Sequence, residues 1–212
     1  MNRYYHFYKP TGCVSARRDA EHQTVMDFFP AEDRDTLFPL GRLDKNTEGL
    51  LLVTDDGKLN HQLLDPSNHV EKTYLLWAAG TLGEGELEQL RTGVYLKGLP
   101  EPTKPARVDI LAEATLGAIP VPLFDNRLSL LEEDPGQPAV CLELTITEGK
   151  RHQIKRMLEA VGCTVVYLRR THFAGIALDE GLHPGEYRPL AEEELTVLLK
   201  NCPEKGSIHC KI

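Results

Sequence analysis

An uninterrupted apolar run, Leu50–Val53, constrains the fold more than any other stretch of the 212-residue chain. Turn sequences bound it on both sides, with Gly49 before it and Asp55-Asp56-Gly57 after it. An apolar run of this length between turn residues is typical of a strand buried in the core. The bend that precedes the strand carries Asp44, so we expect this carboxylate to be held rigidly at the edge of the core.

Alternating patterns predict more strands than helices. In the predicted strand Val70–Ala79 the alternation places Lys72, Tyr74 and Leu76 on one face. Apolar residues recur at helical spacing from Arg151 to Gly162. Further strands are predicted at Arg3–Tyr8, Val94–Leu96, Ala106–Leu111, Val140–Thr147 (half-buried), Thr164–Arg170 and Phe173–Leu178, and further helices at Thr24–Phe29, Lys58–Leu64, Glu84–Arg91 and Glu192–Leu199. Because strands and helices do not alternate regularly, we predict an α+β fold with a mixed or antiparallel sheet.

The length and composition predict one globular domain, residues 1–202, built of one or two lobes, followed by a loose tail, residues 203–212. No apolar stretch approaches the roughly 20 residues that span a bilayer, and the polar N-terminus lacks the apolar core of a signal peptide. The five cysteines are scattered, which favours reduced thiols in the cytoplasm. Cys202 and Cys210 flank His209 but lack a fourth ligand, so no metal site is predicted.

The net charge of −8 hides an uneven distribution. Acidic side chains gather at 84–88, 132–134 and 192–194, whereas Gly149–His172 contains Glu159 as its single acidic residue. The basic residues of that segment are Lys150, Arg151, Lys155, Arg156, Arg169 and Arg170. A basic segment on an acidic protein fits a polyanion site as well as it fits a solvated helix face. Composition leaves both interpretations open.

Spacing alone allows three interpretations of Asp44. The carboxylate can satisfy backbone groups of its own turn, as aspartate often does. It can also begin a calcium loop, although a strand follows where that motif needs a helix, and the twelfth position lacks the usual glutamate. The other residues that match the calcium-loop pattern are Asn46, Glu48, Gly49 and Asp55. In the third interpretation, Asp44 is a functional carboxylate beside Arg42.

Gly41–Gly57 reads G-R-L-D-K-N-T-E-G-L-L-L-V-T-D-D-G and resembles the catalytic motif of RNA pseudouridine synthases, specifically the RsuA-type branch. The resemblance extends over nearly the whole chain. The other matching motifs are Tyr4-Tyr5 with Lys9-Pro10 and Gly12, Glu71-Lys72-Thr73-Tyr74, Thr103-Lys104-Pro105-Ala106, Ile146 to Met157, and Gly185-Glu186-Tyr187-Arg188-Pro189-Leu190. The resemblance implies the pseudouridine synthase fold, in which helices and loops flank an active-site cleft on a mixed, largely antiparallel sheet.

The resemblance also implies roles for individual residues. Asp44 matches the essential catalytic aspartate, and Tyr74 matches a tyrosine that stacks on the target base and is proposed to handle its C5 proton. Lys155 matches a basic residue, commonly arginine, that pairs with the aspartate; lysine cannot make the bidentate contact. Arg42 and Lys155 are expected to keep Asp44 ionised. The residues expected to contact RNA or the target base are Lys72, Lys150, Arg151, Gln153, Arg156, Leu168 and Arg169.

The implied reaction breaks the N-glycosidic bond of a uridine, turns the detached uracil and joins ribose C1′ to uracil C5, without a metal or organic cofactor. The implied partner is ribosomal RNA, with 16S favoured over 23S because the motifs most resemble those of the small-subunit enzyme. A non-catalytic RNA-binding or ribosome-assembly module is the alternative. Family members commonly carry an N-terminal S4-type domain, and no trace of one precedes Tyr4. We expect a cytoplasmic monomer without a membrane partner.

Overall fold

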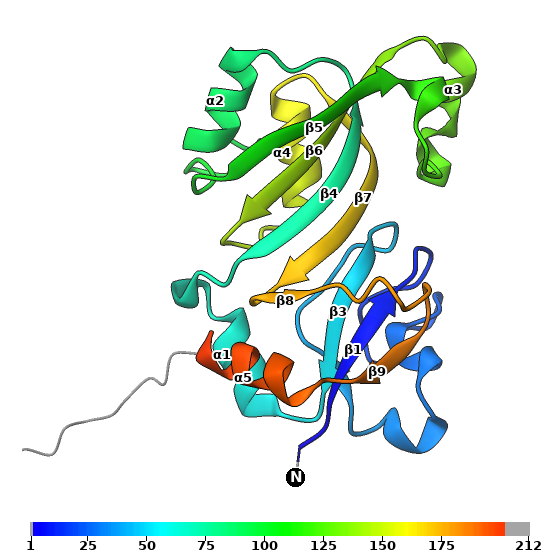
Figure 1. The fold of residues 1–212 in the computed structure, drawn as a ribbon, viewed down its shortest axis with the longest axis vertical. Helices are drawn as coiled ribbons and strands as arrows, with labels where there is room; N and C mark the ends of the chain where they lie inside the picture. Colours follow the sequence, from blue (N-terminus) through cyan, green and yellow to red (C-terminus); the bar gives the residue numbers. More distant parts are fainter. Residues whose placement is uncertain (1, 202–212) are drawn as a thin grey trace, which may run out of the picture.

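A computed structural model describes residues 2–201 as a mixed sheet with helices packed against it (Figure 1). The strands are β1 (Tyr4–Lys9), β2 (Phe38–Pro39), β3 (Glu48–Thr54), β4 (Lys72–Ala79), β5 (Arg107–Thr115), β6 (Pro138–Ile146), β7 (Thr164–Phe173), β8 (Ile176–Ala177) and β9 (Tyr187–Pro189). The α-helices are α1 (Gly57–Leu64), α2 (Glu84–Thr92), α3 (Leu128–Glu133), α4 (Gln153–Ala160) and α5 (Glu192–Lys200). The predicted tail and the pair Cys202 and Cys210 lie outside the described residues.

The sheet has the strand order β5-β6-β4-β7-β3-β1-β9, with β2 paired to β3 and β8 paired to β7. All of these pairings are antiparallel except that of β3 with β7. The predicted α+β class with a mixed, largely antiparallel sheet is therefore confirmed. Within residues 2–201, none of the helices is long and apolar enough to pass through a membrane.

The parallel contact between β3 and β7 joins the two halves of the sheet, which lie one above the other in Figure 1. There Glu48 lies opposite Arg169, and Gly49 lies opposite Arg170. A Cβ atom on Gly49 would come within 2.3 Å of the Arg170 carbonyl oxygen, and the residue has a φ of +104°. Only glycine fits such a close backbone approach in this conformation. The glycine of the central motif thus lets the two halves of the sheet join beside Asp44.

Three apolar clusters hold the layers together. The largest packs β4, β6 and β7 against α4, with Leu76, Leu142 and Met157 fully buried. A second cluster lies beneath α1 and α5, on the face of β3 that carries Leu50 and Leu52. The third covers the other face of β4, β6 and β7. The apolar residues that recur at helical spacing in α4 therefore pack into the largest cluster, on one side of the sheet.

The prediction that the β6 strand is half-buried was wrong. Cys141, expected on the solvent face, is only 6% exposed because it packs against Trp77 and Leu116 in the third cluster. Leu131 of α3 packs against the same cluster. The segment between β5 and β6, which has no clear pattern in the sequence, folds over this face and buries it.

Three other predicted elements differ from the structure. The predicted strand Val94–Leu96 is an isolated bridge between Tyr95 and Pro102. The strand predicted to end at Arg170 continues to Phe173 as β7, and the strand predicted at Phe173–Leu178 is reduced to β8 after a turn at Ala174-Gly175. The pairing of β7 with β4 contains two register shifts, one of them at Thr171. A bulge adds one residue to a strand and breaks the alternation without ending the strand.

Candidate active site

A cleft of about 810 Å³ opens where the two halves of the sheet meet. Its walls come from the loop before β3, from β4 and β7, and from the loop that leads into α4. Most residues that the sequence predicted for the site line this cleft: Arg42, Asp44, Lys72, Tyr74, Lys150, Arg151, Gln153, Lys155 and Leu168. Arg156 and Arg169 do not line it. Segments distant in sequence are thus brought to one cavity.

The carboxylate of Asp44 faces Lys155 across the cleft. Lys155 Nζ lies 2.8 Å from Asp44 Oδ2 and 2.5 Å from Asn46 Oδ1, although Asp44 and Lys155 are 111 positions apart. The turn is closed by the main chain, because Thr47 N donates to the carbonyl oxygen of Asp44 at 3.0 Å. The carboxylate therefore points into the cleft as one member of an ion pair.

Arg42 does not share this ion pair, contrary to expectation. Among the described residues, the groups within ion-pair distance of Asp44 are Lys155 and, at 3.7 Å, His152 Nε2. Arg42 is exposed at the rim of the cleft. His152 had no predicted role. It precedes α4 with a left-handed φ of 53°, a strained conformation of the kind that clusters at functional sites, and this turns its ring toward Asp44.

Buried Lys9 fixes the loop that carries Asp44. Its Nζ atom donates hydrogen bonds to the carbonyl oxygens of Thr47 and Pro10 at 2.9 Å and to that of Lys45 at 3.4 Å. Burial lowers the pKa of Lys9 to about 8, while the nearby Asp44 charge partly opposes this effect. An ammonium with carbonyl acceptors on the loop ties it to the end of β1, which explains the lysine in the opening motif.

Tyr74 and Arg170 form the floor of the cleft. Tyr74 is 7% exposed and Arg170 is 2% exposed. Burial raises the pKa of the Tyr74 phenol, and the positive charge of Arg170 opposes that rise. Leu168 lies on the same strand as Arg170 and supplies apolar lining. Arg170 was missed as a site residue because nothing in the sequence separates it from its neighbour, Arg169.

Lys72 also lies at the floor, beside the ring of Phe173. Its Nζ atom donates to the carbonyl oxygen of Val70 at 2.7 Å and lies 5.7 Å from the centre of that ring. Burial lowers the pKa of Lys72 to about 8, and the positive charge of Arg170 adds to the effect.

The loop into α4 is braced by Gln153, which is 4% exposed. Its Nε2 atom donates to Glu148 Oε1 at 2.7 Å, and its Oε1 atom accepts from Lys150 N at 2.8 Å. Lys150 Nζ is paired with Glu148. These contacts shape the cleft wall, while Arg151 is exposed on it.

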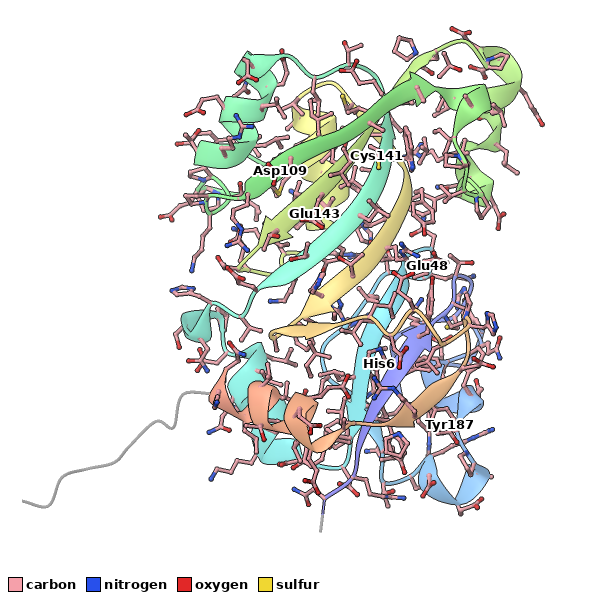
Figure 2. All side chains as sticks on the ribbon, in the orientation of Figure 1. His6, Glu48, Asp109, Cys141, Glu143 and Tyr187 are labelled. Atoms are coloured by element: carbon pink, nitrogen blue, oxygen red, sulfur yellow. The ribbon has the colours of Figure 1, made fainter. Side chains whose placement is uncertain are left out.

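Arg156 and Arg169 point elsewhere. Arg156 donates to the carbonyl oxygen of Lys97 at 2.5 Å, on the outer side of α4. Arg169 interacts with Tyr8, whose hydroxyl donates to Glu48 at 3.3 Å. Glu48 lies at the junction of β3 and β7 (Figure 2). The cleft therefore does not include these two arginines.

The structure does not support a calcium loop at Asp44. Strand β3 follows where the motif needs a helix. Asp55, at the twelfth position, instead accepts hydrogen bonds from Arg3 N at 2.8 Å and Arg3 Nε at 3.0 Å. Residues 2–201 contain no cluster of three or more His, Cys, Asp or Glu side chains able to hold a metal ion.

Comparisons with known proteins point to one family. Residues 3–160 match the family described as RNA pseudouridylate synthase. The uncharacterized RNA pseudouridine synthase YtzG of Bacillus subtilis is 44% identical over 90% of this chain and 70% of its own length. Ribosomal small subunit pseudouridine synthase A of Haemophilus influenzae is 37% identical over 93% of this chain and 74% of its own length. A crystal structure of a pseudouridylate synthase superposes with a TM-score of 0.77 at 36% identity, covering 93% of this chain and 74% of that one.

Proposed function

The chain belongs to the RNA pseudouridylate synthase family and is an isomerase of uridine in RNA, and on this premise we propose that its substrate is 16S ribosomal RNA. The target proposed is the uridine-516 type. A relative named for the small ribosomal subunit supports this choice. We further propose that the protein acts as a cytoplasmic monomer, with 23S ribosomal RNA as the second candidate substrate.

The observation that carries the proposal is the ion pair of Asp44 with Lys155 in a cleft that also holds Tyr74. Isomerisation breaks the bond between N1 and C1′ and forms one between C5 and C1′. Asp44 supplies the carboxylate that the break requires, and Lys155 keeps it charged and oriented. Tyr74 stacks on the uracil while it turns and then accepts the proton that leaves C5. None of these steps needs a metal.

RNA must present an unstacked nucleotide to such a cleft. A base within a helix cannot reach a buried tyrosine, so the target uridine must be flipped out, and stacking on an aromatic ring replaces the stacking that it loses. Lys150, Arg151 and Arg42 line the cleft and are proposed to contact the flanking phosphates. Binding that depends on such contacts weakens as salt concentration rises.

The test is incubation with 16S transcript, 23S transcript and immature small subunits, followed by chemical mapping of pseudouridine. Wild type should modify one uridine in 16S RNA, and Asp44→Asn should modify none. Asp109→Asn is the matched control, because Asp109 is an exposed carboxylate on edge strand β5, in the other half of the sheet from β1 (Figure 2). It should retain wild-type activity.

The other outcomes separate the alternatives. Product in 23S RNA alone would overturn the 16S assignment but keep the chemistry. RNA binding without product in any substrate would favour a non-catalytic assembly role. Equal product from Asp44→Asn and wild type would overturn the catalytic role of the carboxylate.

A further inference from the structure

A β-bulge places Arg170 on the same face as Tyr74. In the pairing of β4 with β7, Thr73 lies opposite His172. The next residue, Tyr74, lies opposite Arg170, so Thr171 is the extra residue of the bulge. Residues directly opposite each other on antiparallel strands share a face. Without the bulge, Tyr74 would be opposite Thr171, and the arginine would point to the other side of the sheet.

The guanidinium of Arg170 is held tightly by its surroundings. Its Nε atom donates to the carbonyl oxygen of Leu50 at 2.8 Å, and its Cζ atom lies 4.7 Å from the centre of the Phe173 ring. The side chain is 2% exposed. The backbone of the same residue packs against Gly49, as described above. A side chain with these contacts has little freedom to leave the floor of the cleft.

One part of this buried cation has no partner. Among the described residues, no side chain or carbonyl accepts a hydrogen bond from Arg170 Nη2. Burying a charged group with an unused donor costs free energy, and natural proteins keep such groups mainly where they serve a site. The carboxylate of Asp44 is paired with Lys155, so Arg170 is not needed to balance its charge.

We propose that Arg170 is a positioning residue for Tyr74, a fixed positive charge that favours the ionised phenol and thereby lets Tyr74 take the C5 proton of the rearranged uracil. This inference rests on the proposed function. It assigns Lys155 and Arg170 to different reacting partners: Lys155 acts on Asp44, and Arg170 acts on Tyr74.

The proton transfer balances within the substrate and Tyr74. After the bond between C5 and C1′ has formed, C5 carries both ribose and hydrogen. The C5–H bond then breaks, its electron pair forms the C5–C6 double bond, and N1 becomes anionic. The phenolate oxygen of Tyr74 receives the C5 proton, and N1 takes up a proton to complete pseudouridine. No oxidant, reductant or cofactor enters the balance.

Burial and the charge of Asp44 disfavour the ionised form of Tyr74, whereas Arg170 favours it. Burial raises the pKa of the phenol, and the Asp44 charge raises it further. Arg170 is the cation that opposes both effects. The charged or titratable side chains that line the cleft around Tyr74 are Arg42, Asp44, Lys45 and Asp65, Lys72 on β4, Arg170 on β7, Glu148, Lys150 and Arg151 on the loop into α4, and His152 and Lys155 at the start of α4.

The test compares Arg170→Met and Arg170→Lys with wild type under single-turnover conditions, using 16S transcript with hydrogen or deuterium at uridine C5. Arg170→Met should lower the rate about tenfold to a hundredfold at neutral pH, within the range that general acid–base groups contribute. Its rate should recover as pH rises, and deuterium should slow it more than it slows wild type. Arg170→Lys should restore most of the rate.

Controls separate this role from folding and from RNA binding. Arg91→Met removes a positive charge from α2, outside the cleft, and should match wild type in rate and isotope effect. The affinity of Arg170→Met for RNA should stay within about twofold of wild type. An Arg170→Met protein that is folded, with the isotope effect and pH profile of wild type, would overturn the inference.

If Arg170→Met does not fold, 3-fluorotyrosine at Tyr74 gives a second measurement. For this measurement Arg170→Gln removes the charge and keeps a donor for the Leu50 carbonyl oxygen. Fluorination makes the phenol more acidic, so it should raise the rate of Arg170→Gln more than that of wild type. Equal effects in both proteins would reject the role of Arg170. An active Asp44→Asn would instead reject the proposed function itself, so the two failures are distinguishable.

Discussion

The change Lys9→Met should separate stability from activity. Lys9 is fully buried, and its pKa falls from an ordinary 10.5 to about 8. The unfolded chain therefore binds this proton more tightly, and at neutral pH the difference costs the folded state about 3 kcal/mol. Methionine fills a similar volume and removes that cost. It leaves the carbonyl oxygens of Thr47 and Pro10 without their donor, at about 1–3 kcal/mol each.

These two effects oppose each other, so the free energy of unfolding at pH 7 should change by no more than about 3 kcal/mol. The reaction rate of Lys9→Met, in contrast, should fall. The lysine ties down the loop of Asp44, and a displacement of about 1 Å in a catalytic group can cost about a hundredfold in rate. We expect the single-turnover rate of Lys9→Met to fall about tenfold to a hundredfold with little change in RNA affinity.

Urea unfolding, RNA binding and single-turnover rates measure the three quantities, and Lys58→Met, an exposed lysine on α1, is the control. The pH dependence of the free energy of unfolding gives a second measurement. Because the pKa of Lys9 is lower in the folded state, the stability of wild type should rise from pH 8 to about pH 10.5, and Lys9→Met should lose part of that rise. A Lys9→Met protein with a wild-type rate would refute the positioning argument.

Three further predictions follow from other contacts. Lys155→Met should lower the rate about a hundredfold, whereas Lys155→Arg should keep most of it because the charge beside Asp44 is retained; equal rates for the two variants would contradict the ion-pair role. Paired with Arg188, Glu194 has its pKa lowered to about 2, so its contribution is present above its ordinary 4.5 and is lost as pH falls toward 2. Glu194→Gln should therefore cost about 1–2 kcal/mol at pH 7 in thermal unfolding, and the loss should vanish near pH 2. The affinity for RNA should fall with salt, and Arg42→Met should reduce the slope of log affinity against log salt by about one; an unchanged slope would place Arg42 away from phosphate.

The sequence was most informative where a motif and a regular pattern coincide. Leu50–Val53 is the strand that its apolar run predicts, and the helical spacing after Arg151 locates the helix that carries Lys155. Together with the resemblance in the loop before the strand, this was enough to bring Asp44 and Lys155 to one site. The predicted pairing of Arg42 with Asp44 is not found in the structure, because closeness in sequence does not fix where a long side chain points.

The sequence pattern of β6 alone does not predict that both faces of this strand are buried. Cys141 alternates with apolar residues as a solvent-facing residue would, and Glu143 on the same side is only partly buried. What covers this face is the segment between β5 and β6, whose leucines reach the cluster around Trp77. Its packing depends on contacts far apart in sequence. A local pattern therefore identifies a strand more reliably than it identifies which faces of that strand are covered.

The choice between Arg169 and Arg170 depends on one extra residue. Leu168 and Phe173 both line the cleft. Strict alternation counted forward from Leu168 places Arg170 on the cleft face of β7, whereas strict alternation counted back from Phe173 places Arg169 on that face. The polar pair Thr171-His172, which suggests a strand break, is the point at which the bulge changes the parity. The bulge is a property of the pairing with β4, so one strand's sequence cannot reveal it. A break in alternation beside two basic residues, inside a strand that borders a cleft, is therefore a reason to test both arginines. At this site the buried one is expected to matter for the C5 proton.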